Sequence, residues 1–262
     1  MAIGSMKAGW KNTVRRDWSG NAMRERLINV REKIATRLGS SKLFCDRISS
    51  LELDKRGHAA GTFSIITLRR IEKLMPKDMA WTAETGCGKS TILFSNLSKQ
   101  HTVFCLDDRE YGTESSLNYF QECELTRNDR VEVVFGPTQK TLALYENFRA
   151  YDCVLIDGPH GYPFPEMEYY YFYPHIRTGG LLIIDDVHIP TIGRLAEFIG
   201  EDDMFELVEV VNTTAVFRRT SAPTFNPFGD GWWEQSYNRR RVPQSNEFHL
   251  NDGKKSLMLD KW

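Results

Sequence analysis

The turn that decides the fold lies between a predicted strand and a predicted helix. It reads Ala83-Glu84-Thr85-Gly86-Cys87-Gly88-Lys89-Ser90-Thr91. Two glycines this close together let the backbone approach a ligand, because glycine has no side chain and accepts unusual backbone angles. A strand, a glycine turn and a helix in this order form the corner at which open α/β folds bind nucleotide-like ligands. The segment therefore predicts a ligand site at the end of the first strand.

Three interpretations of this turn compete. As Glu84-x-Gly86-x-Gly88 it fits the first motif of an S-adenosylmethionine (SAM) site, in which the carboxylate holds the positively charged methionine end of the ligand. It also fits a relaxed P-loop, with Lys89 for phosphates and Ser90 for Mg²⁺. A tight turn without a ligand is the third interpretation. It is the least favoured, because two glycines and an acid are costly at a turn that serves no purpose.

Two acids after the second predicted strand help to distinguish the first two interpretations. Asp107 and Asp108 stand where a carboxylate reaches the ribose hydroxyls of a bound nucleoside, and a P-loop protein has no need of such a residue. The SAM interpretation therefore explains more positions. The run Val154–Asp157 could still serve as the acidic strand of a P-loop protein, so that alternative stays open.

From residue 79 the sequence alternates between short β-rich runs and helical runs. Alternation of this kind predicts a parallel sheet with helices on its faces. A terminal hairpin is expected where Asn212 and Thr213 join the last two runs. We therefore predict an α/β fold, a Rossmann-like, doubly wound, seven-stranded and mostly parallel sheet with a terminal antiparallel hairpin and N-terminal helices. The predicted strands are Met79–Thr82, His101–Leu106, Val131–Phe135, Cys153–Ile156, Leu181–Ile184, Phe205–Val211 and Thr214–Arg218.

The two ends of the chain differ from this middle part. Residues 21–38 and 62–74 have apolar residues at helical spacing, and the second helix should stop before Pro76. After Thr220 the sequence loses its periodicity and carries Trp232 and Trp233, which need burial. We expect a helical extension over 1–60, a SAM-binding domain over 61–219, and a tail over 220–262 that packs on the domain or on a partner subunit.

The composition limits the partners of the protein. Thirty-four basic and 35 acidic residues give a net charge of −1, which provides no field for nucleic acid or for an anionic membrane. No apolar run approaches the roughly 20 residues of a membrane-spanning helix. The five cysteines form no CxxC pair and fit reduced thiols, so we expect a cytoplasmic protein. The tryptophan-rich tail and the N-terminal helices suggest a homodimer.

With these residues assembled, the chain resembles the class I SAM-dependent methyltransferases over roughly residues 80–219. Four segments carry the resemblance: residues 84–88, 106–108, 154–160 and 177–186, the last two reading Val-Leu-Ile-Asp-Gly-Pro-His and Arg-Thr-Gly-Gly-Leu-Leu-Ile-Ile-Asp-Asp. There are two departures: Ser90 replaces the third glycine of the first motif, and the turn at Pro137 lacks the acid that often contacts adenine. The resemblance implies SAM as cofactor, held by Glu84, Thr85, Gly86, Gly88, Asp107, Asp108, Pro137 and Asp157.

Three acids and two histidines follow the fourth and fifth predicted strands: Asp157, His160, Asp185, Asp186 and His188. Ligands bind at this edge of an open α/β sheet. One mechanism uses Mg²⁺ or another divalent cation held by Asp157, Asp185 and Asp186, because carboxylate oxygens suit hard cations. The other uses His160 or His188 as a general base. Acids at strand ends also often cap helices or pair with arginine, and that structural role is the alternative.

These observations predict an enzyme that transfers the methyl group of SAM to oxygen of a small hydroxylated or saccharide acceptor. The predicted catalytic residues are Asp157, His160 and His188. A P-loop ATPase or kinase-like protein, and a non-catalytic binding module with the same fold, are the competing functions.

Overall fold

The computed structural model describes residues 43–52, 63–224 and 230–241. The chain divides into two compact units, Met1–Leu43 and Phe44–Trp262, and the description below concerns the second. The helix predicted over 21–38 lies outside the described residues, as does most of the predicted tail. None of the helices in the described part of the chain is long and apolar enough to cross a membrane.

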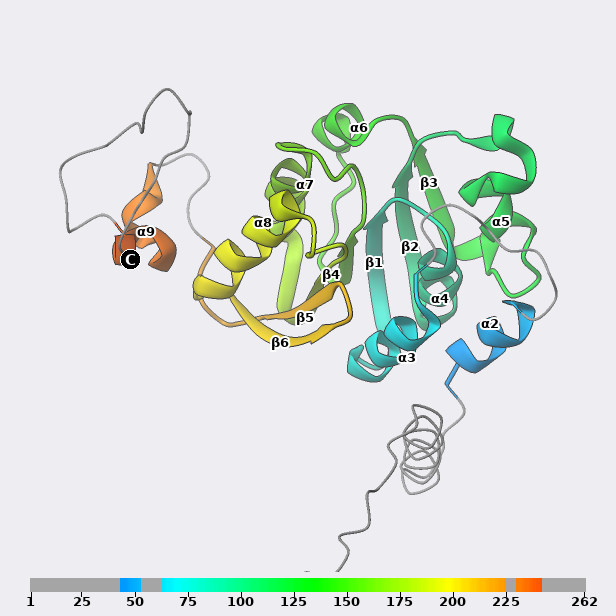
Figure 1. Ribbon diagram of the computed structural model, residues 1–262, viewed down its shortest axis with the longest axis horizontal. Helices are drawn as coiled ribbons and strands as arrows, with labels where there is room; N and C mark the ends of the chain where they lie inside the picture. Colours follow the sequence, from blue (N-terminus) through cyan, green and yellow to red (C-terminus); the bar gives the residue numbers. More distant parts are fainter. Residues whose placement is uncertain (1–42, 53–62, 225–229, 242–262) are drawn as a thin grey trace, which may run out of the picture. The chain divides into compact units, whose positions relative to one another are not determined.

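A seven-stranded sheet forms the centre of the second unit (Figure 1). Its spatial order is β3-β2-β1-β4-β5-β7-β6, and the pairs among the first five are parallel. Strand β7 pairs antiparallel with β5 and with β6. The predicted sheet and terminal hairpin are therefore confirmed. The strands are β1 Met79–Thr85, β2 Ser98–Cys105, β3 Val131–Phe135, β4 Tyr151–Ile156, β5 Ile176–Ile184, β6 Phe205–Val211 and β7 Thr214–Arg219.

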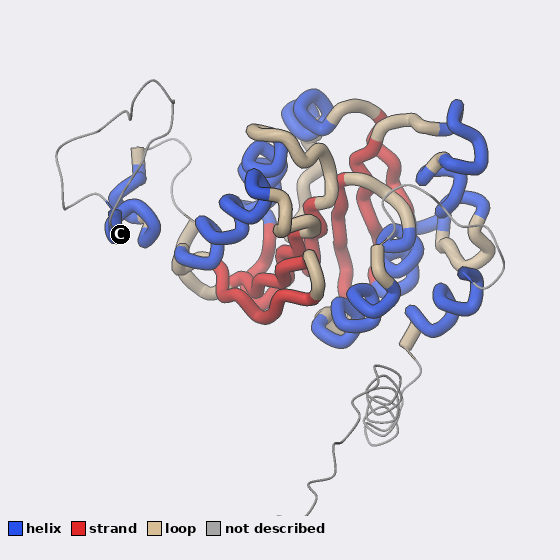
Figure 2. Tube along the Cα trace, in the orientation of Figure 1, coloured by secondary structure: helices blue, strands red, loops and turns tan. Residues whose placement is uncertain are grey.

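Helices cover both faces of this sheet (Figure 2). Side chains along each central strand alternate between two buried clusters, as the two-residue period of a strand requires. Val103, Cys153 and Leu181 pack in one cluster with residues of α2 to α5. Their neighbours Phe104, Val154 and Leu182 pack in the other with residues of α6 to α8. This two-sided burial explains why the strands consist of nearly continuous apolar runs.

The helices connect the strands in the predicted alternation. They are α2 Cys45–Glu52, α3 Ile65–Leu74, α4 Lys89–Leu97, α5 Ser116–Glu122, α6 Thr138–Leu144, α7 Phe164–Phe172, α8 Pro190–Glu201 and α9 Ser236–Arg241. Short 3₁₀ turns lie at Arg109–Glu114, Asn128–Arg130, Tyr173–His175 and Gly231–Glu234. Helix α3 ends at Leu74 as predicted, and Ser64 caps its start by accepting a hydrogen bond from the Ile66 N–H at 3.3 Å.

Two segments flank the predicted domain of residues 61–219. Helix α2 precedes it and packs on α3: the backbone N–H of Cys45 donates to Glu72 at 2.9 Å, and Cys45 and Ile48 are buried in the core. Helix α9 follows it and contacts α8, where the rings of Tyr237 and Phe198 lie 5.0 Å apart. The domain limits at residues 60 and 219 stay predictions.

Asp152 of β4 ties the beginnings of β1, β4 and β5 together. One carboxylate oxygen accepts hydrogen bonds from the backbone N–H groups of Ala80 (2.5 Å) and Trp81 (3.0 Å), and the other forms an ion pair with Arg177. The paired register of β1 and β4 begins only at Thr82 and Cys153, so the carboxylate replaces the missing strand partner. Asp152 is fully buried, so both N–H groups find their acceptor inside the protein rather than in water.

Replacing Asp152 by alanine should destabilise the fold by about 2–4 kcal/mol, because two buried N–H groups lose their acceptor. Urea unfolding followed by circular dichroism measures this loss. The control is Asp129→Ala, which removes an exposed acid paired with Arg127 and should leave the free energy of unfolding nearly unchanged. Equal effects of the two variants would contradict this role of Asp152.

Candidate active site

A cavity of about 840 Å³ opens where the carboxyl ends of the parallel strands meet. One part is formed by the segments that follow β1, β2 and β3, and the other by the segments that follow β4 and β5, the β6–β7 turn and the start of α3. Its lining residues are Phe63, Ser64, Thr67, Gly86, Cys87, Phe104, Cys105, Leu106, Asp108, Ser116, Gly136, Pro137, Thr138, Gln139, Asp157, Gly158, Pro159, His160, Phe164, Asp185, Asp186, Asn212, Thr213 and Thr214.

The glycine turn reaches this cavity through Gly86 and Cys87. Gly86 has φ +80°, and a Cβ atom there would lie 2.4 Å from the carbonyl oxygen of Asp157. Its own N–H donates to the carbonyl of Phe104 at 2.9 Å. Only glycine fits between these neighbours, so this position holds the ends of β1, β2 and β4 in close contact.

Glu84 and Thr85, predicted to contact the cofactor, lie behind the turn rather than on the cavity wall. Glu84 is fully buried; its carboxylate accepts a hydrogen bond from the hydroxyl of Thr91, and one oxygen lies 3.1 Å from Nε2 of His101. The backbone N–H of Gly88 donates to the same Thr91 hydroxyl at 2.9 Å. Gly88 does not line the cavity either, so these residues shape the turn from within.

The two acids after β2 take different positions. Asp108 lines the cavity and accepts hydrogen bonds from the Ser115 hydroxyl (2.6 Å) and the Ser116 N–H (2.7 Å), which fixes the entry of α5. Asp107 is exposed and outside the cavity lining. Its neighbour Arg109 lowers the pKa of the Asp107 carboxyl to about 2. Pro137, the remaining predicted cofactor residue, lines the cavity after β3.

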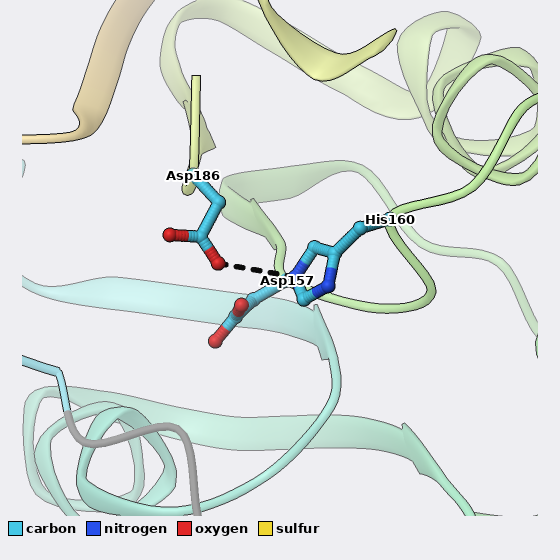
Figure 3. Close-up of side chains that lie close together, drawn as sticks. All are labelled: Asp157, His160 and Asp186. Carbon is cyan, nitrogen blue, oxygen red and sulfur yellow. Dashed lines mark ion pairs between the residues drawn. The ribbon is translucent and has the colours of Figure 1, made fainter. Parts of the chain in front are cut away.

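Asp157, His160 and Asp186 converge on the cavity from the ends of β4 and β5 (Figure 3). One potential ligand atom from each residue lies within 4.8 Å of the others. His160 Nε2 is 3.1 Å from a carboxylate oxygen of Asp186, and His188 Nδ1 is 3.6 Å from the other. The structure thus brings four of the five predicted strand-end residues together, although His188 does not line the cavity itself.

The fifth residue, Asp185, also lines the cavity, and one of its oxygens accepts a 2.5 Å hydrogen bond from the hydroxyl of Thr214. Burial raises the pKa of the Asp185 carboxyl. Burial and the negative charge of Asp185 also raise the pKa of Asp157 well above its ordinary value. The crowded acids therefore resist ionisation, and a bound cation would favour their charged forms.

The site also contains residues that the sequence analysis did not select. The β6–β7 turn adjoins the acids: the N–H of Val187 donates to the carbonyl of Thr213 at 2.8 Å, and the amide of Asn212 donates to Thr67 of α3 at 2.9 Å. The hairpin itself was predicted, but a period-two pattern carries no information on which loop its turn approaches. Glu168 of α7 is the other omission; it is buried next to the site, and its hydrogen-bond partner Thr85 comes from a distant part of the chain.

Comparison with known proteins agrees with this geometry. A family model described as a methyltransferase domain matches residues 83–187, which contain the glycine turn and four of the five strand-end residues, all but His188. The family model thus identifies this segment as a methyltransferase domain. A search of curated protein sequences finds no match.

The methyltransferase domain shares its fold with several solved structures. One is a provisionally assigned O-methyltransferase from Klebsiella pneumoniae, with a TM-score of 0.55 and 17% identity over 76% of this chain and 100% of that one. Another is an O-methyltransferase from Bacillus cereus in complex with S-adenosylhomocysteine (SAH), with a TM-score of 0.51 and 16% identity over 73% of this chain and 97% of that one. At these identities the likeness concerns the fold.

Gly86→Ala should abolish cofactor binding, because the new Cβ would collide with the Asp157 carbonyl and push the turn into the cavity. Gly179→Ala is the matched control: Gly179 has φ +81° but open space around its Cβ position. Both variants carry about 1–2 kcal/mol of backbone strain. Only Gly86→Ala should lose SAH binding by calorimetry, and retained binding in that variant would contradict the close contact.

Stability without metal should fall as pH rises, because burial raises the pKa of the Glu168 carboxyl to about 7, above its ordinary value of 4.5. The stability that the protonated Glu168 carboxyl contributes to the fold is fully present below about pH 4.5 and is lost as pH rises through about 7. Glu168→Gln should therefore become more stable than the wild type across this window, by an amount on the order of 3 kcal/mol. Urea unfolding in chelator at pH 5 and pH 8 measures the difference, and parallel pH profiles would contradict it.

Proposed function

We propose that the domain methylates an oxygen atom of a small hydroxylated or saccharide acceptor, with a divalent cation at the acid cluster. The observation that carries this proposal is the convergence of Asp157, His160 and Asp186 on the cavity that the glycine turn also lines. Methyl transfer needs acceptor oxygen, methyl carbon and sulfur in line, so a cofactor turn beside a polar acceptor site meets its main requirement.

The cavity offers a part for each reactant. SAM would lie along Gly86, Asp108 and Pro137 at the ends of β1, β2 and β3. The acceptor would lie between His160, Phe164 and the Asn212–Thr214 turn. A cavity of about 840 Å³ that must hold both molecules favours an acceptor of modest size.

The donor set fits a divalent cation. Asp157 and Asp186 offer carboxylate oxygens, His160 offers an imidazole nitrogen, and Asp185 lies beside them in the cavity lining. None of the described residues that line the cavity is lysine or arginine. Of these residues, Asp157, Asp185 and Asp186 would hold Mg²⁺ or a similar ion, which supplies Lewis acidity that lowers the pKa of a bound hydroxyl, and His160 would stay available as a base.

Histidine and aspartate side chains of the site would then take up the hydroxyl proton of the acceptor. His160 would accept the acceptor's hydroxyl proton as the new carbon–oxygen bond forms and the carbon–sulfur bond breaks, which leaves SAH. A carboxylate oxygen of Asp186 lies 3.1 Å from His160 Nε2, so it would orient the imidazole and stabilise the imidazolium that forms. His188 approaches the other oxygen of Asp186 and would support this orientation.

The P-loop alternative finds less support in the turn. A P-loop uses its serine hydroxyl on Mg²⁺, but Ser90 is only 4% exposed and does not line the cavity. The Gly88 N–H, which such a loop would direct at phosphate, donates to the Thr91 hydroxyl. The turn is therefore better suited to a ligand that passes along Gly86 and Cys87.

Isothermal titration with SAM, SAH and Mg-ATP, each with and without a chelator, tests the cofactor directly. We expect micromolar binding of both adenosyl ligands and no binding of Mg-ATP. Binding of Mg-ATP alone would mean that Gly88, Lys89 and Ser90 form a phosphate loop and that the proposed function is wrong.

His160→Ala should lower kcat by about 10²–10⁴-fold, because it removes the proposed base. SAH release during turnover of a panel of phenols and saccharides measures the rate. The control is His175→Gln, since His175 stacks on Phe148 at 4.7 Å outside the cavity lining and should leave kcat unchanged. Equal rates for wild type and His160→Ala would exclude His160 as the base.

A further inference from the structure

Glu168 is a buried acid to which the methyl-transfer chemistry above gives no task. It lies on α7, and its side chain is fully buried beside the segment that carries Asp157 and His160. Burying a carboxyl group is costly unless its surroundings compensate it. The contacts of Glu168 therefore indicate what it does.

The first contact runs through Thr85 at the end of β1. The Thr85 hydroxyl donates to Oε2 of Glu168 at 2.8 Å and accepts the backbone N–H of Asp157 at 3.0 Å. A hydroxyl has a single proton, so donation to Glu168 leaves its lone pairs for Asp157. Glu168 thus determines the direction of a two-bond chain that ends on the backbone of Asp157.

The second contact is with Gly158, the next residue along the chain. A Cβ atom at Gly158 would lie 2.2 Å from Oε1 of Glu168 and 2.7 Å from its Cδ. The carboxyl group therefore lies directly against the Gly158 backbone. Two neighbouring peptide units, those of Asp157 and Gly158, rest on one side chain from α7.

We propose that Glu168 is a positioning residue of the methyl-transfer site: through Thr85 and Gly158 it holds the 157–160 segment where Asp157 and His160 reach Asp186. This inference rests on the proposed function and assigns a support to the same cluster. Asp157 and His160 lie in the loop after β4, whereas Asp186 follows β5, so a small shift of the segment separates the three side chains. Groups that orient metal ligands typically change metal affinity by about 10–100-fold when they are removed.

Three variants separate positioning from simple packing. Glu168→Leu fills the space but removes both acceptor oxygens, and Thr85→Val removes the bridging hydroxyl while it keeps the shape. Glu168→Gln keeps one carbonyl acceptor and should rescue most of the effect. Tyr169→Phe is the matched control: it removes a buried hydroxyl from the same helix, and the ring of Tyr169 packs against Phe205.

The experiment measures amide hydrogen exchange at Asp157 by NMR and the dissociation constant for Mn²⁺ alone by titration. In Glu168→Leu and Thr85→Val, we expect Asp157 exchange to accelerate and the Mn²⁺ constant to rise by about 10-fold or more. The Gly86 amide, bonded to Phe104, should keep its rate as an internal reference. Because Glu168 and Thr85 share one hydrogen-bond chain to Asp157, the Glu168→Leu/Thr85→Val double variant should accelerate exchange by less than the product of the two single effects.

Unchanged Asp157 exchange in Glu168→Leu and Thr85→Val would overturn the proposal, as would an equal effect of Tyr169→Phe. Faster exchange with unchanged Mn²⁺ affinity would also overturn it, because the segment would then move without affecting the site. A wild type that binds no Mn²⁺ is a separate result that contradicts the proposed metal site and, with it, the cluster that Glu168 would support. The exchange rates still show in that case whether Glu168 holds the segment.

Discussion

The close contact between the ends of β1 and β4 is the constraint on which the site depends. Gly86 lies so near the Asp157 carbonyl that no side chain fits between them, and Thr85, the preceding residue, accepts the Asp157 N–H. The turn that is expected to hold SAM and the segment that carries Asp157 are thereby fixed to each other. Parallel pairing of β1 with β4 supplies this contact, because it places both carboxyl ends at one edge of the sheet.

The second constraint on the site is the negative charge of its carboxyl groups. Asp157, Asp185 and Asp186 crowd one end of the cavity, and burial together with mutual repulsion raises the pKa of Asp157. A protein that keeps such an arrangement carries a cost in stability that a bound cation would offset. The same negative field suits the sulfonium of SAM. The fold, the acid cluster and the match to a methyltransferase domain are thus all consistent with methyl transfer.

Much of the sheet could be predicted because central strands are buried on both faces and form apolar runs. The limits of the strands were harder to predict, since β5 begins at Ile176 in a polar stretch that pairing with Tyr151 makes extended. The strand-end acids were found because parallel topology dictates where they meet. The position of Glu84 behind the turn could not be predicted, since sequence does not show whether a residue faces a cavity or the interior behind it; its contact with the cofactor stays a prediction. Glu168 gave no signal at all, because its partners come from β1 and from the loop after β4.

The central claim is that one cavity holds the cofactor beside a cation at the acid cluster. A crystal grown with SAH and Mn²⁺ and measured at the manganese absorption edge tests it most directly. The account predicts an anomalous peak bonded to Asp157 and Asp186, with the sulfur of SAH in the same cavity next to Gly86. A structure with SAH bound but no manganese at these acids would contradict the metal, and SAH bound elsewhere would contradict the account as a whole.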